Sequence, residues 1–377
     1  MLNIKKEIIV TGCAGAIGTR LCERLLLDGH EVIGIDNFIS GRFENINMLH
    51  EKFPDRFTLI RKNANDIADI VAQVLPNEIY HAASPSSSQK YEMHPFDCID
   101  SNSQAVDHIL WAIKKYVPKC KFMFLSAAEV YGNPDVSPQS EGYRGNVTCI
   151  RPRGIYDNSK RLGETITAEH NRRFGTNTRI ARIFKTASAY SDPNESNLVN
   201  NFIRQALLNS SFTINGDGSQ VRSICHIDDV VDGLIQLMDT PYHNPVNIGS
   251  EESLSVLEIA KIVHEVVHPD VPTDEIKCTF LPPQKDDAVS VVPDLSLAKK
   301  LFNFAPKHGI KDTIQFISEA MLDSISEANE TENVPSLSEL VVAWDESVDV
   351  SDQVQEIDKS IDSEYENIYN LEANSEN

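Results

Sequence analysis

The sequence predicts an α/β protein: a Rossmann-type, doubly wound parallel sheet with a smaller α/β substrate lobe and an acidic, disordered C-terminal tail. Short apolar, β-branched runs alternate with stretches of helical periodicity over the first half of the chain. A glycine-rich turn joins the first run to the first helical stretch, and an acidic residue ends the second run. Strands that alternate with helices favour a parallel sheet, whose ligand lies at the carboxyl ends of the strands.

The expected elements follow one another in a regular order. The first strand covers residues 7–12 (EIIVTG), and the first helix covers 16–29, where apolar residues recur at helical spacing up to Gly29. Further strands are expected at 30–37, 57–62, 78–84, 120–127 and 177–184. We assign residues 1–184 to the large lobe and 185–317 mainly to the substrate lobe. This boundary is approximate, because later segments can return to the large lobe.

Most of the negative charge lies at the C-terminus. The 377-residue chain has a net charge of −22, and residues 319–377 hold 17 acidic residues and one lysine. This segment is also rich in Ser and Asn, so we assign residues 318–377 to a disordered acidic tail. The charge balance does not favour a nucleic-acid partner.

The seven cysteines are scattered, odd in number and without a C-x-x-C spacing. This pattern argues against a disulfide framework and against a zinc site, and we expect no metal. No apolar run is long enough to span a bilayer, and the N-terminus lacks the apolar core and cleavage site of a signal peptide. We therefore expect a cytoplasmic protein without a membrane partner.

The first strand and helix are joined by a G-x-x-G-x-x-G series made of Gly12, Gly15 and Gly18. Glycines permit a tight turn and let backbone N–H groups approach a pyrophosphate at the helix N-terminus. Asp36 ends the second strand, where a carboxylate accepts hydrogen bonds from ribose hydroxyls and repels a 2′-phosphate. The alternative is a plain strand–helix turn, but the combination predicts NAD binding.

Tyr156 and Lys160 have the spacing of one helix face. The pKa of an ordinary tyrosine is about 10, too high for a base at neutral pH, but a nearby ammonium group favours the phenolate. A solvated helix face is the usual explanation for an isolated Y-x-x-x-K. The flanking RPRGIY and SKRLGE favour a catalytic pair that removes a proton from a hydroxyl group.

These motifs, with EVYGNPDVSPQSE, RPRGIYDNSKRLGET and INGDGSQVRSICHIDDVVDGL, resemble the extended short-chain dehydrogenase/reductase superfamily. Within its nucleotide-sugar branch the sequence is most similar to the UDP-glucuronate decarboxylases, with 4,6-dehydratases and 4-epimerases as neighbours. The resemblance covers residues 7–317 approximately. It implies NAD as a cofactor that is not consumed, a UDP-sugar substrate, and a homodimer through helices at 96–116 and 156–174.

The resemblance also implies roles for single residues. Tyr156, Lys160 and Glu129 would be catalytic, and Lys185, Asn201 and Arg222 would bind the substrate. The residues implied in cofactor binding are Gly12, Gly15, Ala16, Ile17, Gly18, Asp36, Asn37, Asn63, Ala82, Tyr156 and Lys160.

Two departures from the family leave the reaction open. The family carries Thr-Ser-Glu or Thr-Asp-Glu where this chain has Ala127-Ala128-Glu129, and Asn-Thr-Tyr-Gly-Pro-Arg where it has residues 185–190. Since a positioned proton-transfer group contributes ~10²–10⁴ in rate, the alanines imply slow turnover or none. Three hypotheses remain: decarboxylation of UDP-glucuronate through a 4-keto intermediate, epimerisation or oxidation of another nucleotide sugar, and non-catalytic binding of NAD or a nucleotide sugar.

Three further residues are expected to serve the structure. His81 is expected to pack at a strand end, Asn102 to hold the active-site helix, and Asp229 to cap a helix N-terminus. Ser126 is not expected to replace the missing hydroxyls, because successive strand side chains face opposite ways.

Overall fold

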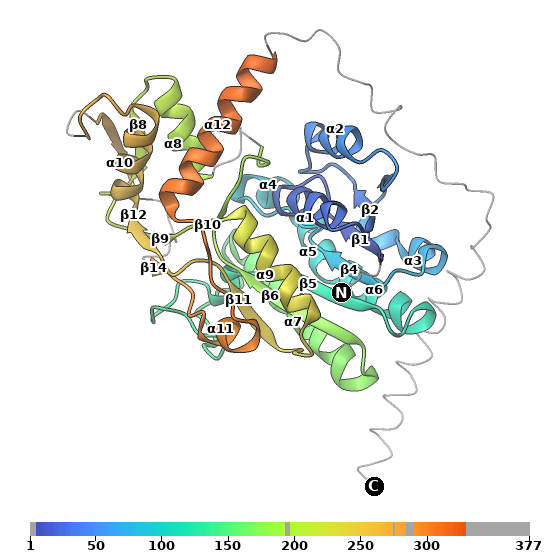
Figure 1. Cartoon of the computed structure of the whole chain (residues 1–377). Helices are drawn as coiled ribbons and strands as arrows, with labels where there is room; N and C mark the ends of the chain where they lie inside the picture. The colour runs from blue at the N-terminus through green and yellow to red at the C-terminus, as the bar shows by residue number, and fades with distance from the viewer. Residues whose placement is uncertain (1–4, 193–196, 274–275, 284–289, 329–377) are drawn as a thin grey trace.

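The computed structural model describes residues 5–192, 197–273, 276–283 and 290–328, with side chains described up to residue 323. Its centre is a seven-stranded parallel sheet in the order β11-β6-β5-β4-β1-β2-β3, which confirms the predicted doubly wound fold (Figure 1). The strands are β1 (Glu7–Thr11), β2 (Glu31–Asp36), β3 (Phe57–Arg61), β4 (Glu78–His81), β5 (Lys121–Ala127), β6 (Asn177–Ile183) and β11 (Pro245–Ile248).

The carboxyl ends of these strands meet at one edge of the sheet. Thr11, the last residue of β1, is paired with Ile35 of β2 on one side and with His81 of β4 on the other. Ala127 at the end of β5 is paired with Ile183 at the end of β6. The glycine-rich turn and the residues after β2, β4, β5 and β6 therefore adjoin at this edge, where ligands bind in such sheets.

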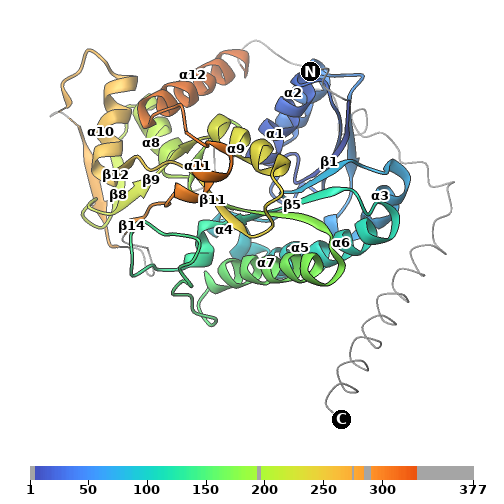
Figure 2. The same ribbon diagram turned by 60° about the horizontal axis from the view of Figure 1, so that its bottom comes forward.

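Helices cover both faces of the sheet (Figure 2). One apolar core joins the sheet to α1, α2, α9 and α11, and a second core joins it to α3, α6 and α7. Because both faces are buried, the strands are apolar on both sides, which made them recognisable as apolar runs. The helices of this lobe are α1 (Ala16–Leu27), α2 (Phe43–Lys52), α3 (Ala68–Val74), α4 (Ser88–Met93), α5 (Pro95–Asn102), α6 (Gln104–Tyr116), α7 (Gly154–Phe174), α9 (Ile227–Asp239) and α11 (Ser296–Phe302), with the 3₁₀ turns η1 (Ala64–Asp66) and η2 (Ala128–Tyr131).

The segment 96–116, which we expected as one helix, forms the two helices α5 and α6. They are separated at Ser103, whose backbone leaves the helical region with φ −128° and ψ −74°. At this break Asn102 Nδ2 donates to the Cys98 carbonyl oxygen over 2.9 Å and contacts Ser159 Oγ of α7 over 3.2 Å. Asn102 therefore ties the end of α5 to the helix that carries Tyr156.

The chain returns to the large sheet after residue 184, because β11 pairs with β6 and α9 packs on the sheet. The other elements of the second half form a small lobe, whose core lies between α8, α10 and α12. Its elements are β7 (Thr186–Ala187), α8 (Leu198–Leu207), β8 (Phe212–Asn215), β9 (Val221–Ser223), β10 (Cys225–His226), β12 (Ser253–Ser255), α10 (Val256–Val267), β13 (Cys278–Leu281), β14 (Ser290–Val291) and α12 (Ile310–Ala328).

The last described helix, α12, enters the segment that we predicted as a tail from residue 318. Ile310, Ile314 and Ile317 are buried in the small lobe and hold this helix in place. The acidic residues beyond 328 lie outside the described residues. Within the part of the chain that the structure describes, every helix is too short or too polar to cross a bilayer.

Candidate functional site

In the first turn, each of the three glycines excludes a side chain for a different structural reason. Gly12 has φ +72°, and a Cβ there would lie 2.7 Å from the backbone of Ala82. A Cβ at Gly18 would overlap the Gly12 carbonyl oxygen, so Gly18 lets α1 pack against the turn. A Cβ at Gly15 would lie 3.4 Å from the Gly12 carbonyl oxygen, which is an ordinary contact, and Gly15 lines a pocket. A side chain at this second glycine would fill the space in which a pyrophosphate can approach the backbone.

This pocket brings together several residues predicted to bind the cofactor. The wall contains Gly12, Gly15, Asp36, Asn37, Asn63 and Ala82. Ala16 and Ile17 are the first residues of α1, so their N–H groups belong to the free amide end of the helix beside this pocket. Lys62, Ser84 and Asp97 also line it, and sequence reasoning missed them because none forms a recognisable motif.

Asp36 stands at the edge where a ribose would lie. Its carboxylate accepts hydrogen bonds from the backbone N–H groups of Ala14 (3.0 Å) and Phe38 (2.8 Å), and burial raises its pKa. Nearby, the side chain of Asn37 accepts from Ile39 N, and that of Asn63 accepts from Asn65 N. These bonds fix the side chains at the rim, and the arrangement fits a dinucleotide.

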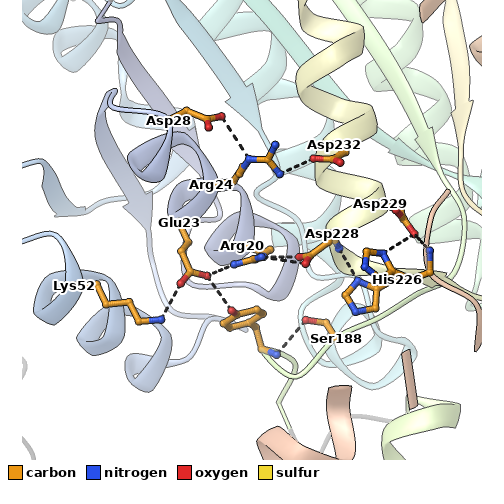
Figure 3. A network of polar contacts seen from close by, with 12 residues as sticks. Arg20, Glu23, Arg24, Asp28, Lys52, Ser188, His226, Asp228, Asp229 and Asp232 are labelled. Carbon is orange, nitrogen blue, oxygen red and sulfur yellow. Dashed lines mark hydrogen bonds and ion pairs between the residues drawn. The ribbon is translucent and has the colours of Figure 1, made fainter. Parts of the chain in front are cut away.

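A polar network behind the turn ties α1 to the rest of the molecule (Figure 3). Arg20 of α1 contacts Glu23 over 2.6 Å and Asp228 at the start of α9 through two nitrogens. Lys52 of α2 adds a second cation to Glu23. The helix that begins at the glycine turn is thereby fixed to α2 and α9, although no sequence motif indicated this network.

Asp229 lies in the same view, but the prediction that it caps α9 is wrong. The N-cap is His226, whose Nδ1 accepts from the Asp228 N–H group. Asp229 instead accepts hydrogen bonds from the backbone N–H groups of Lys307 (2.9 Å) and His308 (3.0 Å). The cap therefore lies three residues earlier than the carboxylate suggested, and Asp229 anchors the segment before α12.

A second bridge joins the glycine turn to residues 188–191. Asn45 Nδ2 donates to the carbonyl oxygens of Ala14 and Tyr190, each over 3.0 Å. The hydroxyl of Tyr190 donates to Glu23 over 2.9 Å. Tyr190 thus contacts the network behind the turn through its side chain and the turn itself through Asn45.

Tyr156 and Lys160 are both buried on α7, facing the end of β5. The ammonium of Lys160 donates to the Leu125 carbonyl oxygen over 2.7 Å and lies 5.6 Å from the centre of the Tyr156 ring. The ring of Tyr91 stacks on Tyr156 with centroids 5.5 Å apart. The two residues therefore lie together, and burial rules out the solvated helix face that would be their ordinary explanation.

The protein alone holds Tyr156 as a neutral phenol. Burial raises its pKa well above the usual value, and the negative charge of Glu129 adds to this effect. Burial also lowers the pKa of Lys160 to about 8, so Lys160 remains mostly protonated at neutral pH. Burial therefore opposes the phenolate form of Tyr156 that the sequence led us to expect. Positive charge beside the ring has to stabilise that phenolate.

Glu129 forms the centre of a charged cluster beside Tyr156. Its Oε1 lies 2.9 Å from Lys185 Nζ. Burial favours a higher pKa for Glu129, but Lys185 and Arg153 lower it to about 2. Burial raises the pKa of Asp157 to about 6, against the opposing charge of Arg153. Sequence reasoning missed Arg153 and Asp157, although their i, i+4 spacing around Tyr156 was a usable signal.

The two alanines contribute no polar group to this site. Ala127 lies in a buried apolar cluster with Tyr156, and Ala128 is buried in the adjoining one. Ser126 donates its hydroxyl to Glu164 over 2.6 Å. Since that hydroxyl already has a buried acceptor, Ser126 does not replace the missing groups.

The other predicted residues have local partners. His81 Nε2 contacts the Ser101 carbonyl oxygen, and burial lowers its pKa to about 4, so it is a neutral packed residue. Asn201 on α8 accepts a hydrogen bond from Arg204, and Arg222 on β9 donates to the Val221 carbonyl oxygen. These contacts lie in the small lobe, so the roles of Asn201 and Arg222 on the nucleotide stay predictions.

Comparisons with known proteins show similar sequences and a similar fold. The chain is 35% identical over 318 residues to UDP-glucuronic acid decarboxylase 1 of Danio rerio, covering 83% of this chain and 73% of that protein. It is 36% identical over 306 residues to UDP-glucuronic acid decarboxylase 1 of Arabidopsis thaliana, covering 81% of this chain and 67% of that protein. The structure resembles UDP-glucose 4-epimerase of Thermotoga maritima, with a TM-score of 0.75 and 25% identity over 85% of this chain and 99% of that one.

Residues 8–249 match the family described as the NAD dependent epimerase/dehydratase family. This match confirms the resemblance to the extended short-chain dehydrogenases/reductases and the expectation of NAD. The chain therefore belongs to the NAD-dependent epimerase/dehydratase family.

Proposed function

We propose that the protein converts UDP-glucuronate to a UDP-pentose by NAD-dependent decarboxylation. The observation that carries this proposal is the placement of Tyr156, Lys160 and Glu129 together at the carboxyl edge of the sheet, beside the pocket made by the glycine turn. The relatives named UDP-glucuronic acid decarboxylase, with about 35% identity, support the choice of reaction.

The residues of this chain suggest how the reaction proceeds. Bound NAD supplies a reversible hydride acceptor for C4 of the sugar. Tyr156, as the phenolate, takes the proton of the C4 hydroxyl, and Lys160 holds positive charge beside it. The resulting 4-keto sugar is a β-keto acid, so carbon dioxide leaves as the electron pair moves onto the ketone. The enolate then takes a proton at C5, and return of the hydride to C4 gives the UDP-pentose and leaves the cofactor unconsumed. Glu129 is ionised and orients the sugar rather than donating a proton.

A second candidate keeps the same site but not the same reaction. By the resemblance drawn from the sequence, residues 185–190 depart from the family pattern. Ala127 and Ala128 bring only methyl groups to the neighbourhood of Tyr156. These features favour either an epimerase or oxidoreductase acting on another nucleotide sugar, or a homologue that binds NAD and a nucleotide sugar without turnover.

We also propose that the protein is a homodimer through α5 and α7. These two helices contact each other and lie on one face of the molecule (Figure 2). Phe96 and Ile99 of α5 and Leu162 of α7 are exposed apolar side chains. A second copy of the same face would cover them in a two-fold arrangement.

Mass spectrometry of the purified protein with NAD and UDP-glucuronate, set beside UDP-glucose and UDP-N-acetylglucosamine, tests the reaction. The expected result is loss of carbon dioxide from UDP-glucuronate to give a UDP-pentose. If UDP-glucuronate returns unchanged while another nucleotide sugar is converted, the epimerase or oxidoreductase hypothesis replaces this one. If every sugar returns unchanged while NAD binds, the protein is a binding homologue.

A further inference from the structure

We propose that Lys185 selects the substrate by charge, so that the site favours a nucleotide sugar with a carboxylate at C6 over its neutral counterpart. The inference rests on the proposed function for the class of ligand. It adds a specificity-determining residue that lies outside the Tyr156 and Lys160 pair.

The sheet register places Lys185 at the substrate edge. Ala127 at the end of β5 is paired with Ile183 at the end of β6. Glu129 and Lys185 each follow two residues later, and their ion pair spans the gap between the two chain segments at 2.9 Å. This is the edge at which doubly wound sheets bind their ligands, so Lys185 stands beside the reacting part of the sugar.

The two members of the ion pair differ in exposure. The side chain of Lys185 is 60% exposed, whereas that of Glu129 is 17% exposed. An ammonium group has three N–H donors, and Glu129 engages one side of it. The less exposed carboxylate of Glu129 therefore positions the ammonium of Lys185, and the more accessible part of the pair is its positive end.

Near Lys185, the residues at the end of β5 offer no free hydroxyl group to a sugar, and the hydrogen-bond donors beside Glu129 are cations. Ala127 and Ala128 contribute methyl groups, and the hydroxyl of Ser126 is bound to Glu164. Arg153 is a second cation beside Glu129 and is bonded to Asp157. A neutral hydroxymethyl group gains little from an ammonium, but a carboxylate forms a shorter and stronger charge-assisted bond. This difference is the basis of the selection.

Calorimetric titration of the NAD-loaded protein with UDP-glucuronate, UDP-glucose and UDP tests the proposal. Lys185→Met removes the charge and keeps the length of the side chain. We expect UDP-glucuronate to bind about 10- to 100-fold more weakly, while UDP-glucose and UDP change less than about twofold. Lys185→Arg keeps the charge and is expected to keep the preference for UDP-glucuronate.

Lys311→Met is the matched control, because Lys311 is also 60% exposed and pairs with Glu265 over 2.6 Å in the small lobe. It is expected to leave all three affinities unchanged. An equal loss for all three ligands in Lys185→Met would overturn the proposal and place Lys185 on the diphosphate. Unchanged affinities would overturn it by showing that Lys185 contacts no part of the ligand.

The binding readout separates this inference from the proposed function. Selective binding of UDP-glucuronate that depends on Lys185, without release of carbon dioxide, would support the inference and refute the decarboxylase proposal. Release of carbon dioxide by both the natural protein and Lys185→Met, with equal affinities, would support the decarboxylase proposal and refute the inference.

Discussion

Ala127 and Tyr156 belong to the same small buried cluster, so the residue at the end of β5 meets the candidate catalytic tyrosine with a methyl group. The resemblance to the nucleotide-sugar enzymes implies a threonine at this position. We expect that a hydroxyl there would share a proton with Tyr156 and with the C4 hydroxyl of the sugar. The methyl group of Ala127 offers no such proton path, although it packs in the same cluster as the ring.

Restoring the hydroxyl by Ala127→Thr is expected to increase turnover of UDP-glucuronate by up to ~10²-fold, because a positioned proton-transfer group contributes at least that much in many enzymes. Ala127→Val adds nearly the same volume without the hydroxyl and is the control for packing. Rates are measured by mass spectrometry of the products. Equal rates for the threonine and valine variants of an active protein would show that another group moves the proton.

Tyr156→Phe is expected to lower turnover by ~10²–10⁴-fold, because it removes the group that takes the sugar proton. The side chain is buried and the ring is stacked on Tyr91, so the variant is expected to keep its fold, and the NAD titration reports any contact that the hydroxyl makes with the cofactor. Turnover and NAD titration are measured on the same preparation. A variant that keeps full turnover would remove Tyr156 from the reaction.

The fold was predictable because its strands are buried on both faces. β1 to β6 appear in the sequence as apolar runs, and the spacing of Gly12, Gly15 and Gly18 matches three distinct backbone requirements. The break at Ser103 was not predictable from periodicity, since both α5 and α6 carry helical patterns. At the break Asn102 contacts Ser159 of α7, and no local pattern reveals such a contact.

The site was predictable where its residues sit within a motif and not where distant segments meet. Tyr156, Lys160 and Glu129 were predicted as catalytic residues from their flanking residues, and this role stays a prediction. The roles of Asn45, Arg153 and Tyr190 depend on contacts across the fold, such as the bond from Asn45 to Tyr190, 145 residues away. Asp229 shows the converse: an acidic residue near a helix start suggested a cap, but a histidine occupies that position.

Tyr190→Phe is expected to weaken NAD binding about two- to tenfold, because it removes one hydrogen bond to Glu23 behind the glycine turn. The affinity for UDP is expected to stay the same, whereas a general loss of stability would weaken the binding of both NAD and UDP. Tyr80→Phe is the matched control, since Tyr80 donates to Glu78 within the sheet. Calorimetric titration with NAD measures both variants. An unchanged affinity in Tyr190→Phe would show that the bond from Tyr190 to Glu23 does not help to position the glycine turn.

The charge of the cluster around Glu129 is expected to change near pH 6. Burial raises the pKa of Asp157 to about 6, so this carboxyl is ionised above that pH and neutral below it. Loss of its negative charge leaves Lys185 and Arg153 opposed by Glu129, whose own pKa of about 2 keeps it ionised. The affinity for UDP-glucuronate is therefore expected to rise about two- to fivefold as the pH falls from 7 to 5.

Asp157→Asn is expected to make this affinity independent of pH over the same range. Asp232→Asn is the control. Burial opposes the ionisation of Asp232, but its ion pairs with Lys307 and Arg24 lower its pKa, so Asp232 does not titrate between pH 5 and 7. Calorimetric titrations at pH 5, 6 and 7 compare the variants. A pH dependence that persists in Asp157→Asn would assign it to a different group.

Phe96→Glu is expected to convert the proposed dimer into a monomer. Phe96 is 77% exposed on α5, next to α7, so in the proposed dimer its ring is covered by the second copy. Two carboxylates buried at a two-fold interface would be desolvated without a partner, which strongly disfavours association.

Leu208→Glu is the control, since Leu208 is 69% exposed just after α8, on the small lobe. Sedimentation velocity is expected to give a dimer for the natural protein and Leu208→Glu, and a monomer for Phe96→Glu. A dimer that persists in Phe96→Glu would move the interface away from α5.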